Sequence, residues 1–214
     1  MTIDRENLLK SILDSLGRID HIELADIPNI DLYMDQVTTF METRLKSSTR
    51  NPEGDKILTK TMINNYAKND LLPPPVRKKY SREHILLLIF IYYYKGILSI
   101  SDIQTLLKPL TEKYFHASGP LDLGAIYEEV FSLENDEIAD LQENIVKKFT
   151  LSQETFKNAP EEEQEVLQLF SFISMLSYDV YVKKLLIEKM IDSFKTATKK
   201  EDLAKNAREK SDPS

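Results

Sequence analysis

Leu58-Thr-Lys-Thr-Met-Ile-Asn-Asn-Tyr-Ala-Lys-Asn-Asp-Leu-Leu-Pro73 is the stretch that decides the fold predicted from this sequence. Thr59 is a residue type that caps helix starts, and Ile63 and Tyr66 are spaced to share the inner side of a helix. The prolines from Pro73 onward end that helix, because proline lacks the backbone donor and restricts the residue before it. The pattern therefore predicts a short, capped, amphipathic helix that ends near Lys68.

The outer side of this predicted helix combines cations, amides and a hydroxyl. Its members are Lys60, Thr61, Asn64, Asn65 and Lys68. Asparagine can form two hydrogen bonds with an adenine edge, and lysine can reach guanine or phosphate. We therefore predict that this side reads bases in the major groove of double-stranded DNA.

Four further basic residues follow the prolines: Arg77, Lys78, Lys79 and Arg82. Their position after the helix suits contacts with backbone phosphates. Residues 44–95 carry 11 basic and 4 acidic side chains, a net charge of +7, whereas the whole chain has a net charge of −7. This asymmetry favours an anionic partner for the middle segment. The alternative is that the segment neutralises its own acidic flanks.

Helix signals surround the central stretch. A first helix is predicted from about residue 4 to Leu16, and Asp31 is expected to cap a second one through Leu45. Ser81 is expected to cap an apolar helix that ends near Gly96. A further helix is expected to begin at Ser99 and Asp102 and to stop at Pro109.

The C-terminal half is predicted to be a helical bundle. One or two helices are expected over residues 123–156, and Pro160 is placed to open another with a long apolar face. The fold class is therefore all-α, with a winged-helix-like helix-turn-helix followed by the bundle. The predicted domains are residues 1–118, residues 119–198 and a flexible tail at 199–214. The apolar C-terminal helices favour a homodimer.

Composition limits the remaining classes of protein. The chain has no cysteine, which removes disulfides and thiolate metal sites and fits a reducing cytoplasm. No signal peptide is visible. The longest apolar run, Ile85 to Tyr94, is about half the length of a membrane span, so no membrane insertion is expected. A phosphate-binding glycine loop, a nucleophile elbow and a helical metal motif are all missing from the sequence, so we expect no enzyme activity, cofactor or metal site.

The order of these elements resembles a known pattern. Leu58 to Leu72, followed by Pro73, Arg77, Tyr80-Ser81 and the segment 98–107, is similar to the DNA-binding half of MerR-type transcription regulators. With Asp31-Leu-Tyr-Met-Asp-Gln-Val37 included, the chain is still more similar to an uncharacterised bacterial family, domain of unknown function 1836. The resemblance implies a helix-turn-helix fold, a double-stranded DNA partner and a role in transcription regulation.

The sequence departs from the MerR pattern at defined positions. Asn64 and Asn65 stand where an arginine and an aromatic residue are usual, and Asp70 stands where a glycine closes the helix. The segment expected to form the wing, Pro74 to Tyr80, is short and has no glycine turn. The loop before the central helix is also long for a helix-turn-helix. The long loop, the short wing and the overall acidity of the chain favour an alternative function, a helical protein-interaction module that keeps the helix-turn-helix scaffold without binding DNA.

Overall fold

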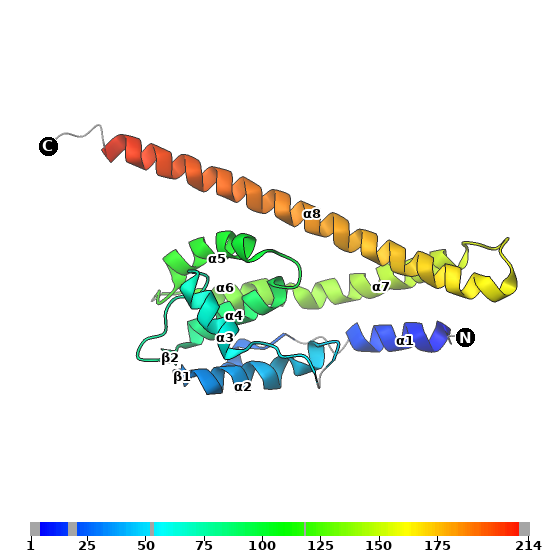
Figure 1. The fold of residues 1–214 in the computed structure, drawn as a ribbon, viewed down its shortest axis with the longest axis horizontal. Coiled ribbons are helices and arrows are strands. Elements are labelled where there is room, and N and C mark those ends of the chain that lie inside the picture. Colours follow the sequence, from blue (N-terminus) through cyan, green and yellow to red (C-terminus); the bar gives the residue numbers. More distant parts are fainter. Residues whose placement is uncertain (1–4, 17–20, 52–53, 118, 210–214) are drawn as a thin grey trace. The chain divides into compact units, whose positions relative to one another are not determined.

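The computed structural model describes residues 5–16, 21–51, 54–117 and 119–209. The fold is all-α, as predicted, with a small two-stranded sheet (Figure 1). Contacts divide the chain into two compact units. Unit 1 contains Met1–Glu23 and Tyr127–Lys183, and unit 2 contains Leu24–Ile126 and Lys184–Ser214. The predicted domain boundaries at 118/119 and 198/199 stay a prediction.

The elements follow one another in this order: α1 (Arg5–Leu16), a 3-10 turn (Leu24–Asp26), β1 (Leu32–Tyr33), α2 (Met34–Leu45), a second 3-10 turn (Lys46–Ser48), α3 (Lys60–Lys68), β2 (Lys79–Tyr80), α4 (Arg82–Tyr94), α5 (Ile100–Tyr114), α6 (Leu123–Ser132), α7 (Glu134–Gln153) and α8 (Glu161–Glu209). The predicted helix that ends near Lys68 is confirmed, and the expected region of one or two helices over 123–156 contains α6 and α7.

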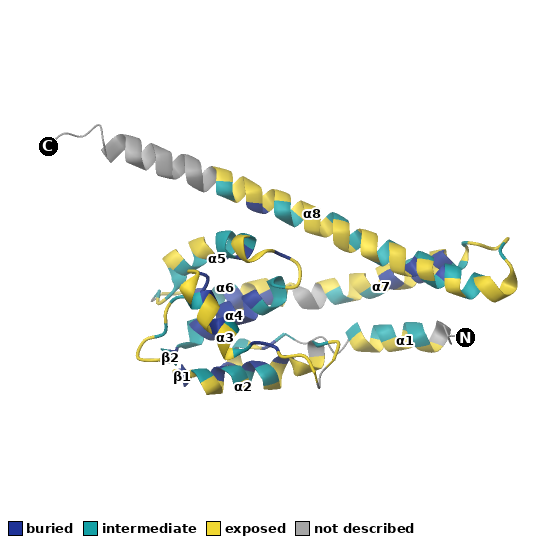
Figure 2. Ribbon diagram, in the orientation of Figure 1, coloured by how far each residue is buried: buried dark blue, intermediate teal, exposed yellow. Residues whose placement is uncertain are grey.

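Helix α4 forms the centre of unit 2. It is apolar on nearly every side, and all its residues from His84 to Ile91 are buried (Figure 2). Helix α5 and strand β2 pack against it, and α2 packs against α3, β1 and β2. The side of α3 that faces inward contains Ile63 and Tyr66, so the opposite side of α3 is left at the surface.

Three predicted helix starts are confirmed by their hydrogen bonds. The Thr59 Oγ1 accepts from the Met62 backbone N–H at 3.1 Å, and the Ser99 Oγ accepts from the Asp102 N–H at 3.1 Å. At Ser81, the backbone N–H donates to the His84 Nδ1 at 3.0 Å, which is the reciprocal bond of a capping box. Each bond satisfies a backbone or side-chain group that the first helical turn leaves without a partner.

The predicted cap at Asp31 is wrong, because the chain is still extended at that point. Leu32 pairs with Tyr80 and Tyr33 with Lys79 in the antiparallel sheet. Helix α2 consequently begins at Met34, with Tyr33 as its N-cap, and the Tyr33 N–H donates to the Gln36 Oε1 at 2.8 Å. The sheet therefore delays the start of the helix by two residues relative to the local signal.

The predicted stop at Pro109 is also wrong, because α5 continues to Tyr114. A proline inside a helix removes one backbone hydrogen bond and costs roughly 3 kcal/mol. Ile103 and Leu107 are fully buried on the side of α5 that packs against α4. We infer that this packing offsets the lost bond, so the last turn remains helical beyond Pro109.

The position of α3 is fixed at both of its ends. Ile57 and Leu58 are buried before the helix, and Leu71 and Leu72 are buried after it. The Lys95 Nζ at the end of α4 donates to the Ile57 carbonyl at 2.6 Å. Burial lowers the pKa of the Lys95 ammonium, as expected for a cation removed from water.

The end of α3 contains a non-glycine residue in the left-handed region. Asp70 has a φ of 53°, and the Leu71 N–H that follows it donates to the Tyr66 carbonyl at 2.9 Å. This arrangement resembles the Schellman helix end, in which glycine is usual at the position of Asp70.

We expect Asp70→Gly to raise the free energy of unfolding by about 0.5–1 kcal/mol, because glycine adopts this conformation without the Cβ penalty. Urea denaturation followed by circular dichroism measures the change. Asp70→Asn, which removes the same charge and keeps the Cβ, serves as the control for loss of charge. A lower stability for Asp70→Gly would show that the Asp70 side chain contributes more than its backbone costs.

Unit 1 has its own small core. Ile145, Phe149 and Phe172 are buried together, and partly buried leucines and an isoleucine of α1 and α8 pack against them. The Gln168 side chain donates to the carbonyls of Gln153 and Thr155, which ties α8 to the end of α7.

Helix α8 starts directly after Pro160, as predicted. The Pro160 carbonyl accepts from the N–H groups of Glu163 and Gln164. The backbone is helical through Glu209, so residues 199–209 of the predicted tail are helical, and residues 210–214 lie outside the described residues. Flexibility of the tail stays a prediction.

Candidate nucleic-acid interface

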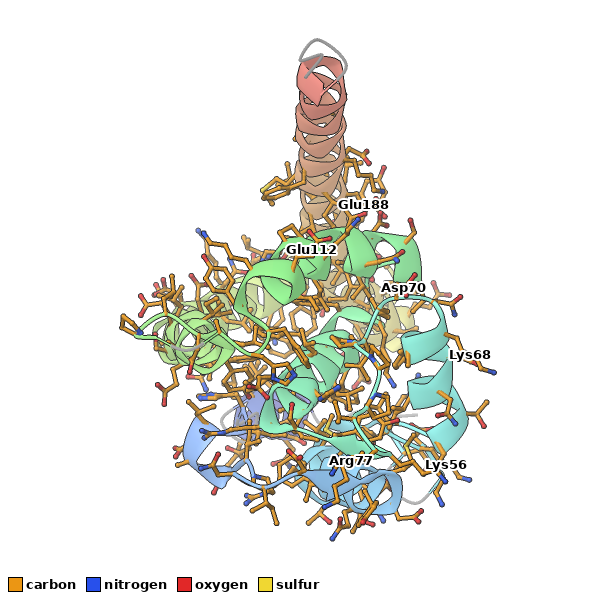
Figure 3. All side chains as sticks on the ribbon, turned by 90° about the vertical axis from the view of Figure 1, so that its left-hand side faces the viewer. Lys56, Lys68, Asp70, Arg77, Glu112 and Glu188 are labelled. Atoms are coloured by element: carbon orange, nitrogen blue, oxygen red, sulfur yellow. The ribbon has the colours of Figure 1, made fainter. Side chains whose placement is uncertain are left out.

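The outer side of α3 contains the five residues predicted to read bases. Lys60, Thr61, Asn64, Asn65 and Lys68 are all exposed, and α3 has no carboxylate of its own. The Lys60 ammonium forms an ion pair with Asp35 of α2, in which both side chains remain more than half exposed. Figure 3 shows Lys68 and Asp70 toward one end of α3 and Lys56 toward the other.

A tight turn follows the prolines and presents Arg77 and Lys78. The Val76 N–H donates to the Lys79 carbonyl at 3.1 Å, and the Lys79 N–H donates to the Val76 carbonyl at 2.9 Å. The φ angles of Arg77 and Lys78 are 51° and 63°, so both central residues occupy the left-handed region. This is the φ pattern of a type I′ turn, for which Asn-Gly is the preferred pair. We call residues 76–79 the dibasic turn.

The dibasic turn uses two residue types that its backbone disfavours. An L-residue other than glycine loses roughly 1–2 kcal/mol in the left-handed region, and the turn contains two in succession. Both side chains are exposed, so no buried contact of Arg77 or Lys78 offsets that cost. Figure 3 shows Arg77 toward the same end of α3 as Lys56.

The other two predicted phosphate-binding residues contact the protein itself. The Lys79 Nζ lies 5.3 Å from the centre of the Tyr33 ring, a cation–π distance across the sheet. The Arg82 Nη2 donates to the Leu24 carbonyl, and its Nε is buried. The structure therefore groups Arg77 with Lys78 at the turn and places the Arg82 guanidinium against the backbone of the 3-10 turn.

Lys56 belongs to the same surface but was not selected by the sequence reasoning. It is exposed and lines an open groove of about 550 Å³ between α2 and the start of α3. Lys60, Glu42, Leu58 and several threonines also line that groove. The sequence signal that could have identified Lys56 is its position four residues before Lys60. The buried residues Ile57 and Leu58 lie between Lys56 and the helix.

Strand β2 packs against a buried histidine, His84. The His84 ring lies 5.4 Å from the Tyr80 ring and 4.9 Å from the Phe115 ring, both edge to face. Burial lowers the pKa of the His84 imidazole below its ordinary 6.5, and the Pro74 and Pro73 backbone acts in the opposite direction. Nearby, the exposed His116 lies 3.7 Å from the Glu83 carboxylate.

The pH dependence of stability follows from that lowered pKa. Above pH 6.5 the imidazole is neutral in both folded and unfolded chains; below it, the unfolded chain takes up a proton that the folded chain resists. We therefore expect stability to fall as the pH drops from 6.5 toward the folded-state pKa. Urea denaturation at a series of pH values measures this. His84→Gln should flatten the dependence of stability on pH, and glutamine can still form the capping box at this position. His116→Gln should leave the contribution of His84 to this pH dependence unchanged.

No group of three or more potential metal ligands lies together within the described parts of the chain. The site therefore consists of an exposed polar and cationic side of α3 and a dibasic turn that follows α3 in the chain. Such groups can bind anions and hydrogen-bonding edges.

The fold and this surface define an all-α protein with a small two-stranded sheet and a tight basic turn between α3 and α4. The family model "Domain of unknown function (DUF1836)" matches residues 22–130, a little over half of the 214 residues, and the chain belongs to this family. No curated protein and no solved structure matches the chain. Among the described residues, no helix combines the length and apolar character needed to cross a membrane.

Proposed function

We propose that this protein is a sequence-specific DNA-binding regulator of MerR-like type that uses α3 and the dibasic turn. The observation that carries the proposal is the pair of left-handed cations, Arg77 and Lys78, in the turn. Residues held in an unfavourable backbone conformation concentrate at functional sites, where their side chains have a role that outweighs the cost. Two exposed cations in a fixed turn suit neighbouring phosphates of a duplex.

The base-reading part of the proposal belongs to α3. Its exposed amides at Asn64 and Asn65 have the donor and acceptor groups that match an adenine edge, and Lys60 and Lys68 lie on the same side. The dibasic turn supplies affinity that does not depend on sequence, and α3 supplies the discrimination between bases. A helix-turn-helix with a short wing has this division of roles.

One observation favours the second candidate function, a protein-interaction module. Lys60 is paired with Asp35, and Glu42 lines the adjacent groove, so both signs of charge occur at the starting end of α3. A mixed surface of this kind suits a protein partner as well as a phosphate backbone. Binding measurements with DNA separate the two functions.

The test of the proposal is titration of the full chain against labelled duplexes, one random pool and one pool enriched by selection, at about 50 mM and about 200 mM salt. We expect binding to both pools at the lower salt, and tighter binding to the selected pool. The affinity should fall steeply at the higher salt, because released counterions drive the phosphate contacts. Absence of binding at low salt would overturn the proposal and favour the interaction module.

A substitution on α3 tests base reading directly. Asn64→Ala should weaken binding to selected duplexes by roughly 1–3 kcal/mol and change binding to the random pool little, because it removes a base contact without removing charge. Fluorescence anisotropy with both pools gives the comparison. Asn158→Ala, an exposed amide of unit 1, is the matched control and should change neither. Equal losses in both pools would contradict base reading by Asn64.

A further inference from the structure

The segment that contains the dibasic turn begins and ends beside one buried ring, the imidazole of His84. At the end of the segment, the Ser81 N–H donates to the His84 Nδ1 at 3.0 Å, and the Ser81 Oγ lies 2.9 Å from the same nitrogen. At its beginning, the backbone of Pro74 and Pro73 contacts the ring. Proline has no backbone N–H, so these contacts are made by its carbonyl as an acceptor. The His84 ring therefore bridges the two ends of residues 73–81.

The bond to Ser81 determines which ring nitrogen carries the proton. Because the Ser81 N–H can only donate, Nδ1 is the acceptor, and the neutral ring carries its proton on Nε2. Nε2 is buried and has no hydrogen bond of normal geometry, so its contact with the proline carbonyls is a weak one. Each nitrogen of the His84 ring thus faces the backbone at one end of the segment.

Two aromatic rings fix the plane of the imidazole. Tyr80 of β2 and Phe115 at the end of α5 both lie edge to face with it. Tyr80 is itself buried, and its strand position pairs with Leu32. Since interiors are close-packed, the His84 ring cannot rotate toward other partners unless β2 or the end of α5 moves.

The dibasic turn needs an outside restraint, because its own residue types oppose its backbone. Arg77 and Lys78 both occupy the left-handed region, and their side chains are exposed. The two hydrogen bonds between Val76 and Lys79 close the turn, and the His84 ring closes the segment on either side of it. A strained conformation persists only where the surrounding structure holds it in place.

We propose that His84 is the positioning residue of the dibasic turn and that protonation of its ring releases the turn. The ring is only 1% exposed, so it acts through the backbone of residues 73–81 and not through a contact with DNA. The positioning role is a property of the fold alone. Its effect on DNA affinity rests on the proposed function.

Protonation conflicts directly with the bond to Ser81. A protonated imidazole has a donor at each nitrogen and no acceptor, so it cannot accept from the Ser81 N–H. That N–H then loses its partner, and a donor without a partner inside a protein is costly. The segment can satisfy the N–H again only by moving away from the ring, which removes the restraint on the dibasic turn.

The ionisable groups around the ring are few. Burial lowers the pKa of His84, the proline backbone raises it, and among the charged neighbours His116 lowers it and Glu83 raises it. On β2, burial raises the pKa of the Tyr80 phenol, which is therefore neutral. The Arg82 guanidinium on α4 is directed to the Leu24 carbonyl. The net effect is a lowered pKa, so His84 is neutral at pH 7 and takes up its proton as the pH falls below 6.5.

The first experiment measures the affinity of the full chain for the selected duplexes from about pH 8 to about pH 5 at constant salt. We expect the affinity to fall by at least about threefold on acidification, within the limit of about tenfold per pH unit for one proton. His84→Gln can still form the capping box but takes up no proton, so it should remove the fall. An affinity that rises or stays constant in the wild-type chain, or the same fall in His84→Gln, would overturn release by protonation.

Removing the two cations of the turn determines whether His84 acts through the turn. In the variant with Arg77→Ala and Lys78→Ala, we expect the remaining affinity at low salt to lose this fall on acidification. His116→Gln is the matched control at an exposed ring nearby, and it should retain the wild-type fall. A fall that persists without Arg77 and Lys78 would contradict a role at the turn.

The second experiment uses no DNA. His84→Leu keeps an apolar side chain but removes the acceptor for Ser81, and trypsin can cleave after Arg77 or Lys78 only when the turn opens. At neutral pH we expect cleavage there to be at least about fivefold faster in His84→Leu than in the wild-type chain, with His84→Gln close to wild type. Mass spectrometry identifies the cleaved bonds.

Cleavage within the long helices controls for general unfolding. The bonds after Lys147 in α7 and Lys189 in α8 lie far from the dibasic turn in the sequence, and their cleavage should change little in His84→Leu. Equal acceleration at every site would show that His84 only stabilises the fold and would overturn the positioning role.

The two experiments separate this inference from the proposed function. If no duplex binds, the proposed function fails, and cleavage at Arg77 and Lys78 still decides the positioning role. If duplexes bind but His84→Gln has the wild-type pH dependence, the proposed function stands and release by protonation is wrong.

Discussion

Replacing Arg77 with asparagine and Lys78 with glycine is expected to weaken binding to all duplexes by about a hundredfold at 50 mM salt, from two lost phosphate contacts. The same double substitution should raise the free energy of unfolding by about 1–2 kcal/mol, because asparagine and glycine are the preferred pair for this backbone. Affinity and stability therefore change in opposite directions. Anisotropy titrations and urea denaturation of one variant measure both.

Two controls separate the charge from the backbone. Arg77→Ala with Lys78→Ala should lose the same affinity without gaining stability, because alanine retains the Cβ penalty. Lys147→Ala with Lys189→Ala removes two charges from exposed positions outside the proposed interface and should change affinity little. We also expect the slope of log affinity against log salt to fall by about 2 for the dibasic-turn variants only. A double variant that is more stable and binds normally would remove the main support for the proposed function.

Phe172→Ala is expected to lower the stability of unit 1 by about 3–5 kcal/mol. Phe172 is 2% exposed and packs edge to face on Phe149, with ring centres 5.4 Å apart. Alanine leaves a cavity in a core that has few other buried residues. Few neighbouring side chains can therefore repack to fill it. Hydrogen exchange of the α7 amides, detected by mass spectrometry, reports the loss.

Phe170→Ala is the matched control, two residues earlier on the same helix. Phe170 is 65% exposed, so its truncation should cost well under 1 kcal/mol. We therefore expect Phe172→Ala to weaken folding and Phe170→Ala to leave it nearly unchanged. Equal protection losses from the two variants would show that the two faces of α8 are not distinct.

Local chemistry predicted much of the fold. Thr59, Ser81 and Ser99 were recognised as helix starts because a capping side chain bonds to backbone within its own turn, and each was confirmed. The exposed side of α3 followed from the spacing of Ile63 and Tyr66, which are buried. These features depend only on residues within four positions of one another.

The errors involve partners far along the chain. Tyr33 replaces Asp31 as the cap because its strand pairs with residues 79–80, and two-residue strands are too short for an alternating pattern. Pro109 remains helical, which we attribute to tertiary packing that overrides its propensity. Arg82 binds a carbonyl 58 residues away, which its local charge pattern does not reveal.

The candidate site was predicted in composition but not in conformation. The sequence identified Arg77 and Lys78 as phosphate-binding candidates through their charge and their position after the prolines. The left-handed φ angles of both residues arise from closure of the turn between Val76 and Lys79, and neither residue type favours them. The opposed effects of the dibasic-turn substitutions on affinity and stability depend on this conformation.

Because α3 is anchored at both ends, the loop that precedes it does not determine where the helix lies. Because Lys95 holds the Ile57 carbonyl and buried residues flank the helix, the position of α3 does not depend on the length of the segment between α2 and Ile57. The added entropy of a longer loop grows only slowly with its length. That segment is therefore a spacer with freedom to diverge in length and sequence, while the surface formed by α3 and the turn keeps its geometry.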